Sequence, residues 1–343
     1  MTVTTARADT TSAAALLAHA RELCLPVLTE WVGSLPQPLR LMGAYHFGWC
    51  DTSGSPVHAH PGKALRPALV FATATACGAR AQAAIPAAAA IELVHNFTLI
   101  HDDVLDVDRT RRGRATVWSV WGIADAILLG DALHSLAVRV LATDLPGPIA
   151  AAAVTRLETA AIEMCRGQSE DCQFETRPRV GIDDYVRMAM GKTGALMGCA
   201  CALGAFCAGA DAETVSAMER FGRELGLAFQ FADDLLGIWG NSAVTGKPAG
   251  ADLARRKQSL PVVAALQSDT SAAVELNRIY RSTTPMAPAM IVRATALIEA
   301  ADGRVTVQRM AEQRLAAAIE ALPDPRTAGE LLVLAQLAVQ RDR

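Results

Sequence analysis

Three aspartates in the stretch LIHDDVLDVDRTRRG have the clearest potential for chemistry. Asp102 and Asp106 are four residues apart, so on a helix their carboxylates lie on one face, about 6 Å apart along the axis, with Asp103 about 100° away. Like charges placed this way oppose helix formation unless a cation neutralises them. Magnesium prefers such hard oxygen ligands and leaves its other positions to water and phosphate. We therefore predict a magnesium site here.

A solvated acidic face is the simpler alternative, but the neighbouring residues argue against it. They are apolar and place this end of the helix close to the core: Leu99, Ile100, Val104 and Leu105. A second acidic pair, Asp233 and Asp234 in FQFADDLLGIWG, also lies among apolar residues. Buried carboxylates without a partner are costly, and helical bundles often build metal sites from carboxylates on facing helices. The two acidic segments together predict one metal-dependent site.

The lysines indicate where anions bind. The 32 basic residues comprise 28 arginines and only four lysines, which are Lys63, Lys192, Lys247 and Lys257. A lysine binds phosphate as a compact point charge, and arginine is no simple substitute for it in a crowded site. Three of the four are flanked by glycine or proline, and we expect these at helix ends where backbone amides add to an anion site. Ordinary surface lysines in a biased composition are the alternative.

The elements that must position these residues are helices. Hydrophobic residues make up 51% of the 343 residues, aromatic residues only 5%, and alanine-rich runs dominate the apolar segments. Alanine and leucine are strong helix formers, and no long alternating strand pattern occurs. Short breakers separate the helical segments without forming an interdomain linker. We predict one all-α domain over residues 1–343, with about residues 1–12 disordered.

Composition also excludes several classes of protein. The net charge of −3 provides no basic excess for nucleic-acid binding. The eight cysteines lie mostly in apolar helical segments without paired spacing, which predicts reduced core thiols in a cytoplasmic protein. The segment GALMGCACALGAFCAGA is short and rich in small residues, so we expect a buried helix there and no integral membrane segment.

Five motifs in a fixed order resemble those of the trans-isoprenyl diphosphate synthases, or polyprenyl synthetases. They are GKALRP, HNFTLIHDDVLDVDRTRRG, GKTGALM, FQFADDLLGIWG and TGKPAGADLARRKQSLP, and they span roughly residues 61–263. The resemblance implies an isoprenoid synthase-type bundle of about ten core helices around a deep central cavity. It also implies a homodimer, with the two aspartate motifs facing each other across the cavity mouth.

The resemblance implies a role for each residue already singled out. Asp102 and Asp106 would bind two magnesium ions with support from Asp103, and Asp233 would bind a third. The implied catalytic set is Asp102, Asp103, Asp106, Asp233, Asp234, Lys192 and Lys257. The allylic diphosphate would contact Arg111, Lys192, Thr193, Gln230, Lys247 and Lys257, and isopentenyl diphosphate would contact Lys63, Arg66, His95 and Arg112. The family's first motif often carries a basic residue where this chain has Ala64.

The implied reaction joins isopentenyl diphosphate to an allylic diphosphate. Neutralising the leaving diphosphate lets the allylic carbon–oxygen bond break, and an apolar cavity keeps water from the resulting cation. Phe97 and Thr98 lie about one helical turn before Asp102, where family members carry the floor that limits the product. One aromatic residue with a small neighbour resembles synthases of the twenty-carbon geranylgeranyl diphosphate, whereas two aromatics would indicate fifteen-carbon farnesyl diphosphate.

Two rival functions remain on the sequence alone. A class I terpene cyclase would cyclise one substrate, but its second metal motif fits poorly here, where Gly237 and Asn241 stand at the relevant positions. An inactive partner subunit would be expected to lose aspartates of the first motif, and all three are present. Gly237 replaces a carboxylate of the family's second motif. We expect it to leave room for metal-bound water, with an oxygen from Asn241 nearby, and we expect Gly237→Asp to change magnesium dependence modestly.

Overall fold

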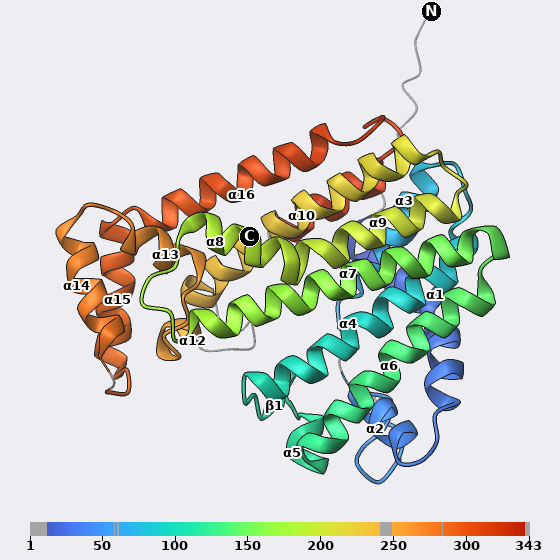
Figure 1. Cartoon of the computed structure of the whole chain (residues 1–343), viewed down its shortest axis with the longest axis horizontal. Coiled ribbons are helices and arrows are strands. Elements are labelled where there is room, and N and C mark those ends of the chain that lie inside the picture. The colour runs from blue at the N-terminus through green and yellow to red at the C-terminus, as the bar shows by residue number, and fades with distance from the viewer. Residues whose placement is uncertain (1–11, 58, 60–61, 241–248, 283, 340–343) are drawn as a thin grey trace, which may run out of the picture.

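Long helices form the molecule, as the alanine-rich sequence predicts. The computed structural model describes residues 12–57, 59, 62–240, 249–282 and 284–339. In Figure 1 the long helices α4, α7, α9 and α10 occupy the middle of the molecule, and α14 and α15 form a hairpin at one end. The prediction of an all-α fold is confirmed, since the only strands in the described part of the chain are two of two residues each.

The helix bounds are as follows. The amino-terminal half contains α1 (Ala13–Gly33), α2 (Leu39–His46), α3 (Leu65–Ala76), the 3₁₀ turn η1 (Ala81–Ala84), α4 (Ile85–Leu105), α5 (Val117–Trp121), α6 (Ile123–Asp144) and α7 (Gly147–Phe174). The carboxy-terminal half contains α8 (Ile182–Ala189), the π-helical segment η2 (Met190–Gly194), α9 (Ala195–Cys207), α10 (Ala212–Trp239), α12 (Ala251–Ala254), α13 (Leu260–Leu266), α14 (Ser271–Arg281), α15 (Pro288–Ala300), α16 (Gly303–Glu320) and α17 (Gly329–Val339).

The start of α1 limits the predicted disorder. The Ser12 side chain accepts a hydrogen bond from the Ala15 amide at 3.2 Å and so caps the helix. The remainder of the predicted segment, residues 1–11, lies outside the described residues.

Glycines let the central helices approach backbone to backbone. A Cβ at Gly226 on α10 would stand 2.6 Å from the Cα of Gly194, and a Cβ at Gly222 would stand 2.8 Å from the Cα of Gly198. On the opposite side, a Cβ at Gly191 would meet the carbonyl oxygen of Glu163 on α7 at 2.8 Å. Side chains at these positions would push α7 and α10 away from η2 and α9. The small-residue segment predicted to be a buried helix is therefore the tightly packed centre of the bundle.

Three hydrophobic clusters share α10. Phe221 and Leu225 belong to the largest cluster, Leu227 and Phe231 to the second, and Ile238 to the third, at the carboxy-terminal end. Because α10 contributes to all three clusters, it connects the main bundle to the α13–α15 region. The end of α10 also carries the second aspartate motif.

Two short strands carry the arginines of the first motif. Strands β1 (Thr110–Arg111) and β2 (Arg114–Ala115) pair antiparallel after α4. The two-residue turn between them has positive φ at both positions, 52° at Arg112 and 76° at Gly113. A type I′ turn requires this backbone, and glycine adopts it at low cost. The hairpin therefore holds Arg111 and Arg112 in fixed, adjacent positions.

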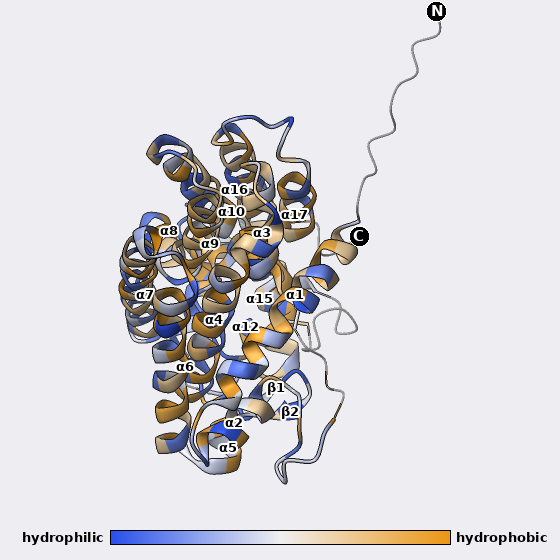
Figure 2. Cartoon of the chain, turned by 90° about the vertical axis from the view of Figure 1, so that its right-hand side faces the viewer, coloured by the Kyte–Doolittle hydropathy of each residue, from blue (hydrophilic) through white to orange (hydrophobic). Residues whose placement is uncertain are grey.

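Three helical segments are long and apolar enough to cross a membrane by length and composition. They are Ala81–Leu105, Ile123–Asp144 and Ile182–Cys207. The last is the most enclosed, with 78% of its most apolar window buried. Figure 2 shows hydrophilic and hydrophobic residues alternating around α6 and α7 at the edge of the bundle.

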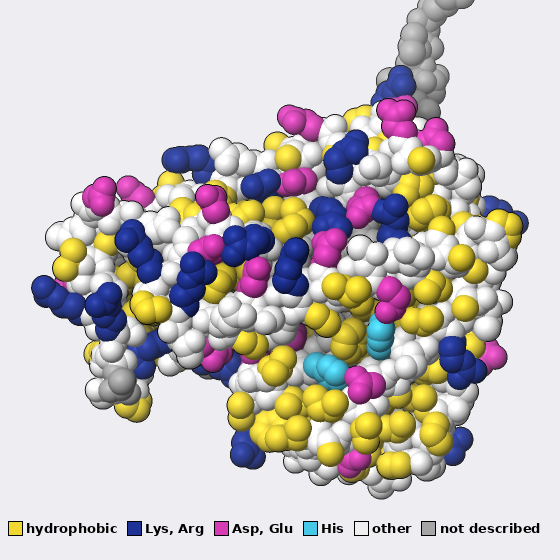
Figure 3. All heavy atoms as spheres, viewed as in Figure 1, with side chains coloured by type: hydrophobic (Ala, Val, Ile, Leu, Met, Phe, Trp, Pro, Cys, Tyr) yellow, Lys and Arg dark blue, Asp and Glu magenta, His cyan; other side chains and the backbone are white. Residues whose placement is uncertain are grey.

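The surface carries one broad apolar area. In Figure 3 hydrophobic side chains gather over α5 and α6. The exposed large side chains of these helices are Val120, Ile123, Ile127 and Leu128, and Leu105 and Val107 extend the exposed group beyond α4.

The cysteine prediction holds in part. All eight cysteines are free thiols. Cys24, Cys199 and Cys201 are buried, but Cys165 and Cys172 on α7 are exposed. The last two are therefore not core residues, because they lie on the side of α7 that lines a cavity.

Candidate active site

The first aspartate motif ends helix α4. The Asp106 amide donates a hydrogen bond to the Asp102 carbonyl at 2.8 Å, so the two side chains lie one helical turn apart. Asp102 is partly buried and Asp106 is exposed. Burial raises the pKa of Asp102, the Lys192 ammonium opposes this change, and the neighbouring Asp106 adds to it. A cation between the two carboxylates would relieve the repulsion that opposes ionisation of Asp102.

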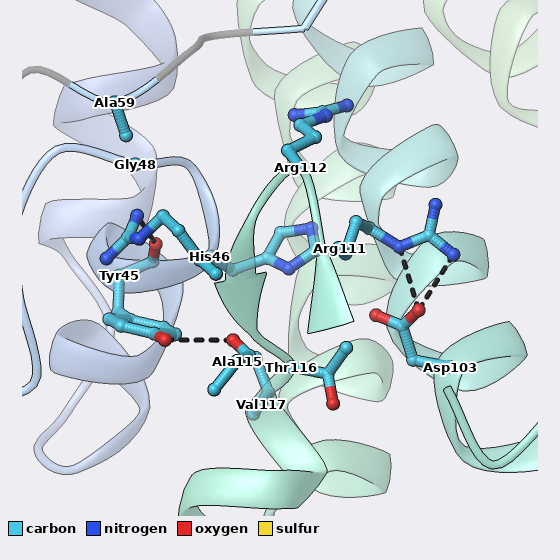
Figure 4. A pocket seen from close by; sticks show the side chains of 11 residues that line it. Tyr45, His46, Gly48, Ala59, Asp103, Arg111, Arg112, Ala115, Thr116 and Val117 are labelled. Carbon is cyan, nitrogen blue, oxygen red and sulfur yellow. Dashed lines mark hydrogen bonds and ion pairs between the residues drawn. The ribbon is translucent and has the colours of Figure 1, made fainter. Parts of the chain in front are cut away.

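The middle aspartate of this motif has a different partner. Asp103 is 2% exposed, and its Oδ1 accepts from Arg111 Nε at 2.8 Å and lies 2.7 Å from Arg111 Nη2. Figure 4 shows this pair beside a small pocket that Arg112 also lines. Asp103 therefore fixes the hairpin arginine, and its predicted support of the metal ions stays a prediction.

The tip of the hairpin meets the glycine–lysine segment. A Cβ at Gly62 would stand 2.7 Å from Nη2 of Arg112, so this guanidinium lies directly against the backbone beside Lys63. Arg21 on α1 donates to the carbonyls of Gly62 and Lys63, at 3.4 Å each. Lys63 and Arg112 come from segments about fifty residues apart, and the fold brings them to one place. Burial lowers the pKa of Arg112, which a bound anion would counteract.

Arg66 and His95 lie beside this cationic group. Arg66 Nη1 lies 3.2 Å from His95 Nε2, and a guanidinium can only donate, so Nε2 accepts and the imidazole proton sits on Nδ1. Burial and then the Arg66 charge hold the His95 pKa well below its usual range. His95 is therefore a neutral polar group next to two cations. All four residues predicted to bind isopentenyl diphosphate lie in this region.

Helix α4 also carries a buried polar chain that the sequence analysis missed. Asn96 Nδ2 donates to Glu92 Oε1 at 2.9 Å, and Asn96 Oδ1 lies 3.1 Å from His46 Nε2. Burial raises the pKa of Glu92, against the opposing charge of Arg66. These hydrogen-bonded residues thus lie next to the cationic group, since the charges of Arg66 and Arg112 both act on Glu92.

Lys192 lies in the π-helical segment η2. The prediction that it marks a helix end is wrong, because η2 continues α8 into α9 without a break. The wider π turn allows the close contact of Gly191 with α7, and such turns are frequent at functional sites. Lys192 Nζ lies 2.6 Å from Asp171 Oδ2 on α7.

Asp171 connects the two aspartate motifs. Burial opposes its ionisation, but the charges of Lys257 and Lys192 outweigh burial and lower its pKa. Lys257 is buried too, and four carboxylates outweigh that burial and raise its pKa: Asp171, Asp252, Asp234 and Asp106. The last of these belongs to the first motif. Lys257, which lies in the segment between α12 and α13, is therefore stabilised in its charged form by carboxylates of both motifs.

The two aspartates of the second motif differ in environment. Asp233 is exposed, whereas Asp234 is 2% exposed and accepts hydrogen bonds from the Tyr185 hydroxyl and, at 2.9 Å, from the Leu260 amide. Burial raises the pKa of Asp234 to about 7, although its hydrogen bonds oppose the change. Only Asp233 is open to a cation, so the expectation that both aspartates are buried among apolar residues is wrong for Asp233.

Gln230 and Thr193 link the second motif to η2. Gln230 Nε2 donates to Asp234 Oδ1 at 3.0 Å, and Thr193 Oγ1 donates to Gln230 Oε1 at 2.8 Å. Gln230 and Thr193, two of the six residues predicted to bind the allylic diphosphate, thus form one hydrogen-bonded row with Asp234.

Lys247 and Asn241 lie outside the described residues. The described part of helix α10 ends at Trp239, so the expected contribution of Asn241 stays a prediction. The predicted room for water beside Gly237 is absent. The carboxylate of Asp252 fills it, with Cγ 2.6 Å from the position of a Cβ at residue 237.

An apolar cavity of about 470 Å³ opens beside Asp102 and Lys192. Its volume is in the range of small-molecule sites, about 300–1,000 Å³. Phe97 and Thr98 line the cavity, as predicted for chain-length residues. The Phe97 ring packs edge-on against His101 and lies 5.2 Å from the His134 ring on α6, centroid to centroid. The charged groups thus stand at one end of a space whose walls are mostly apolar.

The residues present fit magnesium with few protein ligands. Within the described ranges no three His, Cys, Asp or Glu side chains gather closely enough to enclose an ion. Magnesium commonly binds one or two carboxylates and takes water and substrate phosphate as its other ligands. Asp102 with Asp106, and Asp233 on the other side, provide this kind of donor set, with Lys192 and Lys257 nearby for phosphate.

The sequence analysis missed three polar residues of the site. Gln168 and Asp171 on α7 face the cavity or its lysines, and Asp252 lies against Gly237. The i, i+3 spacing of Gln168 and Asp171 in GQSEDCQF places them on one helix face and was an available signal. Asp252 gave no such signal, since its contact with α10 depends on the fold.

Comparison with known proteins finds one family. Residues 48–298 match the family described as polyprenyl synthetase. The chain is 53% identical to the geranylgeranyl diphosphate synthase of Mycobacterium tuberculosis (strain ATCC 25618 / H37Rv) over 328 residues, covering 96% of this chain and 94% of that relative. It is 42% identical to the (2E,6E)-farnesyl diphosphate synthase of Mycobacterium bovis (strain ATCC BAA-935 / AF2122/97), with coverage of 95% and 92%.

Solved structures with a similar fold come from the same family. A polyprenyl synthetase from Streptomyces coelicolor A3(2) superposes with a TM-score of 0.90 at 43% identity, covering 95% of this chain and 99% of that one. A polyprenyl synthase from Caulobacter crescentus CB15, complexed with calcium and isoprenyl diphosphate, superposes with a TM-score of 0.81 at 26% identity, covering 98% and 100%.

Proposed function

Because the chain belongs to the polyprenyl synthetase family and is a trans-prenyltransferase, we propose that it makes geranylgeranyl diphosphate. It would do so by condensing isopentenyl diphosphate head to tail with dimethylallyl, geranyl or farnesyl diphosphate. The observation that carries the proposal is the apolar cavity with Asp102 and Lys192 at one end and Phe97 in its wall. The relative of higher identity is a synthase of this product.

The chain's own residues would divide the two substrates between them. Lys63, Arg66 and Arg112 supply the charges for isopentenyl diphosphate, and His95, held neutral, contributes a polar group without repelling the cations. Lys192 and Lys257 would hold the allylic diphosphate together with Arg111, which Asp103 keeps in place. This arrangement sets the allylic carbon towards the apolar cavity, where little water competes for it.

Magnesium is the cofactor that this donor set suits, and three ions would be held by Asp102, Asp106 and Asp233. When bound, these ions neutralise charge on the leaving diphosphate. Asp171 adds to the site by pairing with Lys192 at 2.6 Å, which keeps the ammonium in position before substrate arrives. Asp234 orients Gln230 from the buried side of α10.

We propose a cytoplasmic homodimer of single-domain subunits. The contributions of α10 to all three hydrophobic clusters support one domain. The exposed apolar side chains of α5 and α6 support association of two copies through this face. The close glycine contacts within Ile182–Cys207 support a place in the bundle core instead of in a membrane.

Farnesyl diphosphate is the alternative product, and the relative with 42% identity supports it. We propose that Phe97 decides between the two, because its ring lines the cavity and packs against the rings of His101 and His134. For the product to stop at fifteen carbons, the wall at Phe97 would have to block the cavity once two five-carbon units had been added to dimethylallyl diphosphate.

The test is product analysis by mass spectrometry with magnesium, isopentenyl diphosphate and each allylic primer. We expect a twenty-carbon diphosphate from farnesyl diphosphate, and longer products from Phe97→Ala because the wall opens. Val154→Ala on α7 is a matched control, because it also shortens an apolar side chain that packs on the core. Failure of the folded protein to elongate any primer would overturn the proposal, and arrest at fifteen carbons would replace it with the alternative. A cyclised product formed without isopentenyl diphosphate would indicate a terpene cyclase.

A further inference from the structure

The second aspartate motif lacks a carboxylate that the first motif has. Asp102 and Asp106 stand at i and i+4 on α4, and the corresponding positions on α10 hold Asp233 and Gly237. The space beside Gly237 is nevertheless occupied by a carboxylate. The three atoms nearest to a Cβ built at residue 237 are Oδ2, Cγ and Oδ1 of Asp252, with Oδ1 at 3.3 Å.

This glycine differs from the others on α10. Gly222 and Gly226 admit the backbone of neighbouring helices, since their nearest atoms are backbone atoms of η2 and α9. At Gly237 the nearest atoms belong to the side chain of Asp252, fifteen residues further along the chain. The absence of a side chain at residue 237 therefore makes room for a carboxylate and not for a helix.

The backbone of α12 places Asp252 at this position. Gly250 has φ of 74°, and its amide donates to the Ile238 carbonyl at 3.1 Å, which joins the start of α12 to the end of α10. The Lys257 amide donates to the Asp252 carbonyl at 2.9 Å and closes the following turn. Leu253, next to Asp252, is fully buried and anchors the helix. One hydrogen bond thus joins the residues before Asp252 to α10, and a second fixes the turn that follows Asp252.

The charge of Asp252 acts on the groups of the active site. It contributes to the raised pKa of Lys257, together with Asp171, Asp234 and Asp106. The Asp252 carboxylate therefore lies close enough to Lys257 for its charge to act on the ammonium.

We propose that Asp252 supplies, from a separate segment of the chain, the carboxylate that residue 237 lacks, and that with Asp233 it holds a divalent cation beside bound diphosphate. The inference rests on the proposed function for the identity of the diphosphate ligand. It assigns to α12 a part in the second metal site and explains why glycine is compatible with that site. Asp233 remains the exposed ligand, and Asp252 takes the place of the i+4 residue.

The experiment moves the carboxylate between the two segments. Four full-length variants are compared with the wild type: Asp252→Ala, Asp252→Asn, Gly237→Asp and the double variant Gly237→Asp with Asp252→Ala. Asp183→Ala, which removes an exposed carboxylate on α8, is the control for loss of charge. Binding of Mn²⁺ is measured by the electron paramagnetic resonance of the free ion, with saturating inorganic diphosphate and without it.

We expect Asp252→Ala and Asp252→Asn to weaken one diphosphate-dependent Mn²⁺ site by about 10- to 100-fold. Gly237→Asp should also weaken it, because the new side chain and Asp252 need the same space. The double variant should return to within about threefold of the wild type, since one carboxylate again stands on the face of Asp233. The Asn variant guards against misfolding, because it keeps the shape of the side chain.

Two results would overturn the inference. One is Mn²⁺ binding by Asp252→Asn equal to that of Asp183→Ala. The other is a double variant that binds no better than Asp252→Ala. Neither result depends on prenyl transfer. If the wild type elongated no primer, the proposed function would fail, but Mn²⁺ binding would still show whether Asp252 is part of the metal site.

Discussion

The two aspartate motifs of this protein end two long helices, α4 and α10, but they are built differently. The first is local, because its carboxylates come from five consecutive residues and its supporting arginine follows on the next hairpin. The second is assembled at long range. Its carboxylates come from α10 and α12, and Leu260 and Tyr185 hold Asp234 from two further elements. The second motif therefore depends on tertiary packing where the first depends on helix geometry.

The buried aspartate of each motif shows the same difference. Asp103 pairs with a cation, Arg111, whereas Asp234 accepts from a hydroxyl, an amide side chain and a backbone amide. Asp103 thus fixes a group that is itself predicted to touch substrate. Asp234 joins α10 to α8 and α13 through hydrogen bonds from neutral donors. Such bonds are sufficient to hold the helices together.

The largest effects are expected when the predicted metal ligands Asp102 and Asp233 are replaced, one in each motif. We expect Asp102→Ala to lower kcat/KM by about 10³-fold and Asp233→Ala by about 10²-fold, because Asp252 leaves the second site one carboxylate. The measurement is steady-state elongation of farnesyl diphosphate over a range of magnesium concentrations. A near-wild-type Asp233→Ala enzyme would remove Asp233 from the metal site, and excess magnesium should restore the Asp233 variant more than the Asp102 variant.

A smaller effect is expected at the buried aspartates. Asp103→Asn should lower kcat/KM by about 10- to 100-fold, because Arg111 loses its anionic partner, at a cost of about 1–3 kcal/mol in the free energy of unfolding. Asp234→Asn should cost only about 1 kcal/mol, because an amide oxygen still accepts from Tyr185 and Leu260. Urea unfolding and kinetics of both variants provide the test. Equal losses of activity would show that the two buried aspartates do the same work.

The sequence predicted the local motif well and the long-range motif poorly. The i, i+4 spacing on an apolar helix was sufficient to place Asp102 and Asp106 one turn apart, because helix geometry is fixed. The all-helical fold followed from composition for a similar reason. Lys63, Arg66, His95 and Arg112 were identified through the family resemblance, and the structure brings them to one region.

What the sequence did not reveal depended on packing between distant segments. The burial of Asp234 and exposure of Asp233 follow from which side of α10 meets Tyr185, and no periodicity in FQFADDLLGIWG specifies that partner. The π turn at Lys192 accompanies the close contact of Gly191 with α7, which depends on how distant helices pack. Asp252 could not be placed beside Gly237 until the chain between α10 and α12 had been folded back.

The smallest expected effect concerns the link between the two motifs. Arg255, just after α12, pairs with Asp108, which lies two residues beyond the first motif and is 9% exposed. Arg255→Ala should cost about 1 kcal/mol, because the pair is only half-exposed on the arginine side and Asp108 is left without its cation. We also expect a less steep magnesium activation curve, because Arg255 joins the segment after the first motif to α12, which carries Asp252. The measurements are urea unfolding and the steepness of the magnesium activation curve. Arg326→Ala, which breaks an exposed pair with Asp324 far along the chain, serves as the control and should change neither. An Arg255→Ala enzyme that matches this control in both measurements would show that the pair of Arg255 and Asp108 does not link the local and the assembled motif.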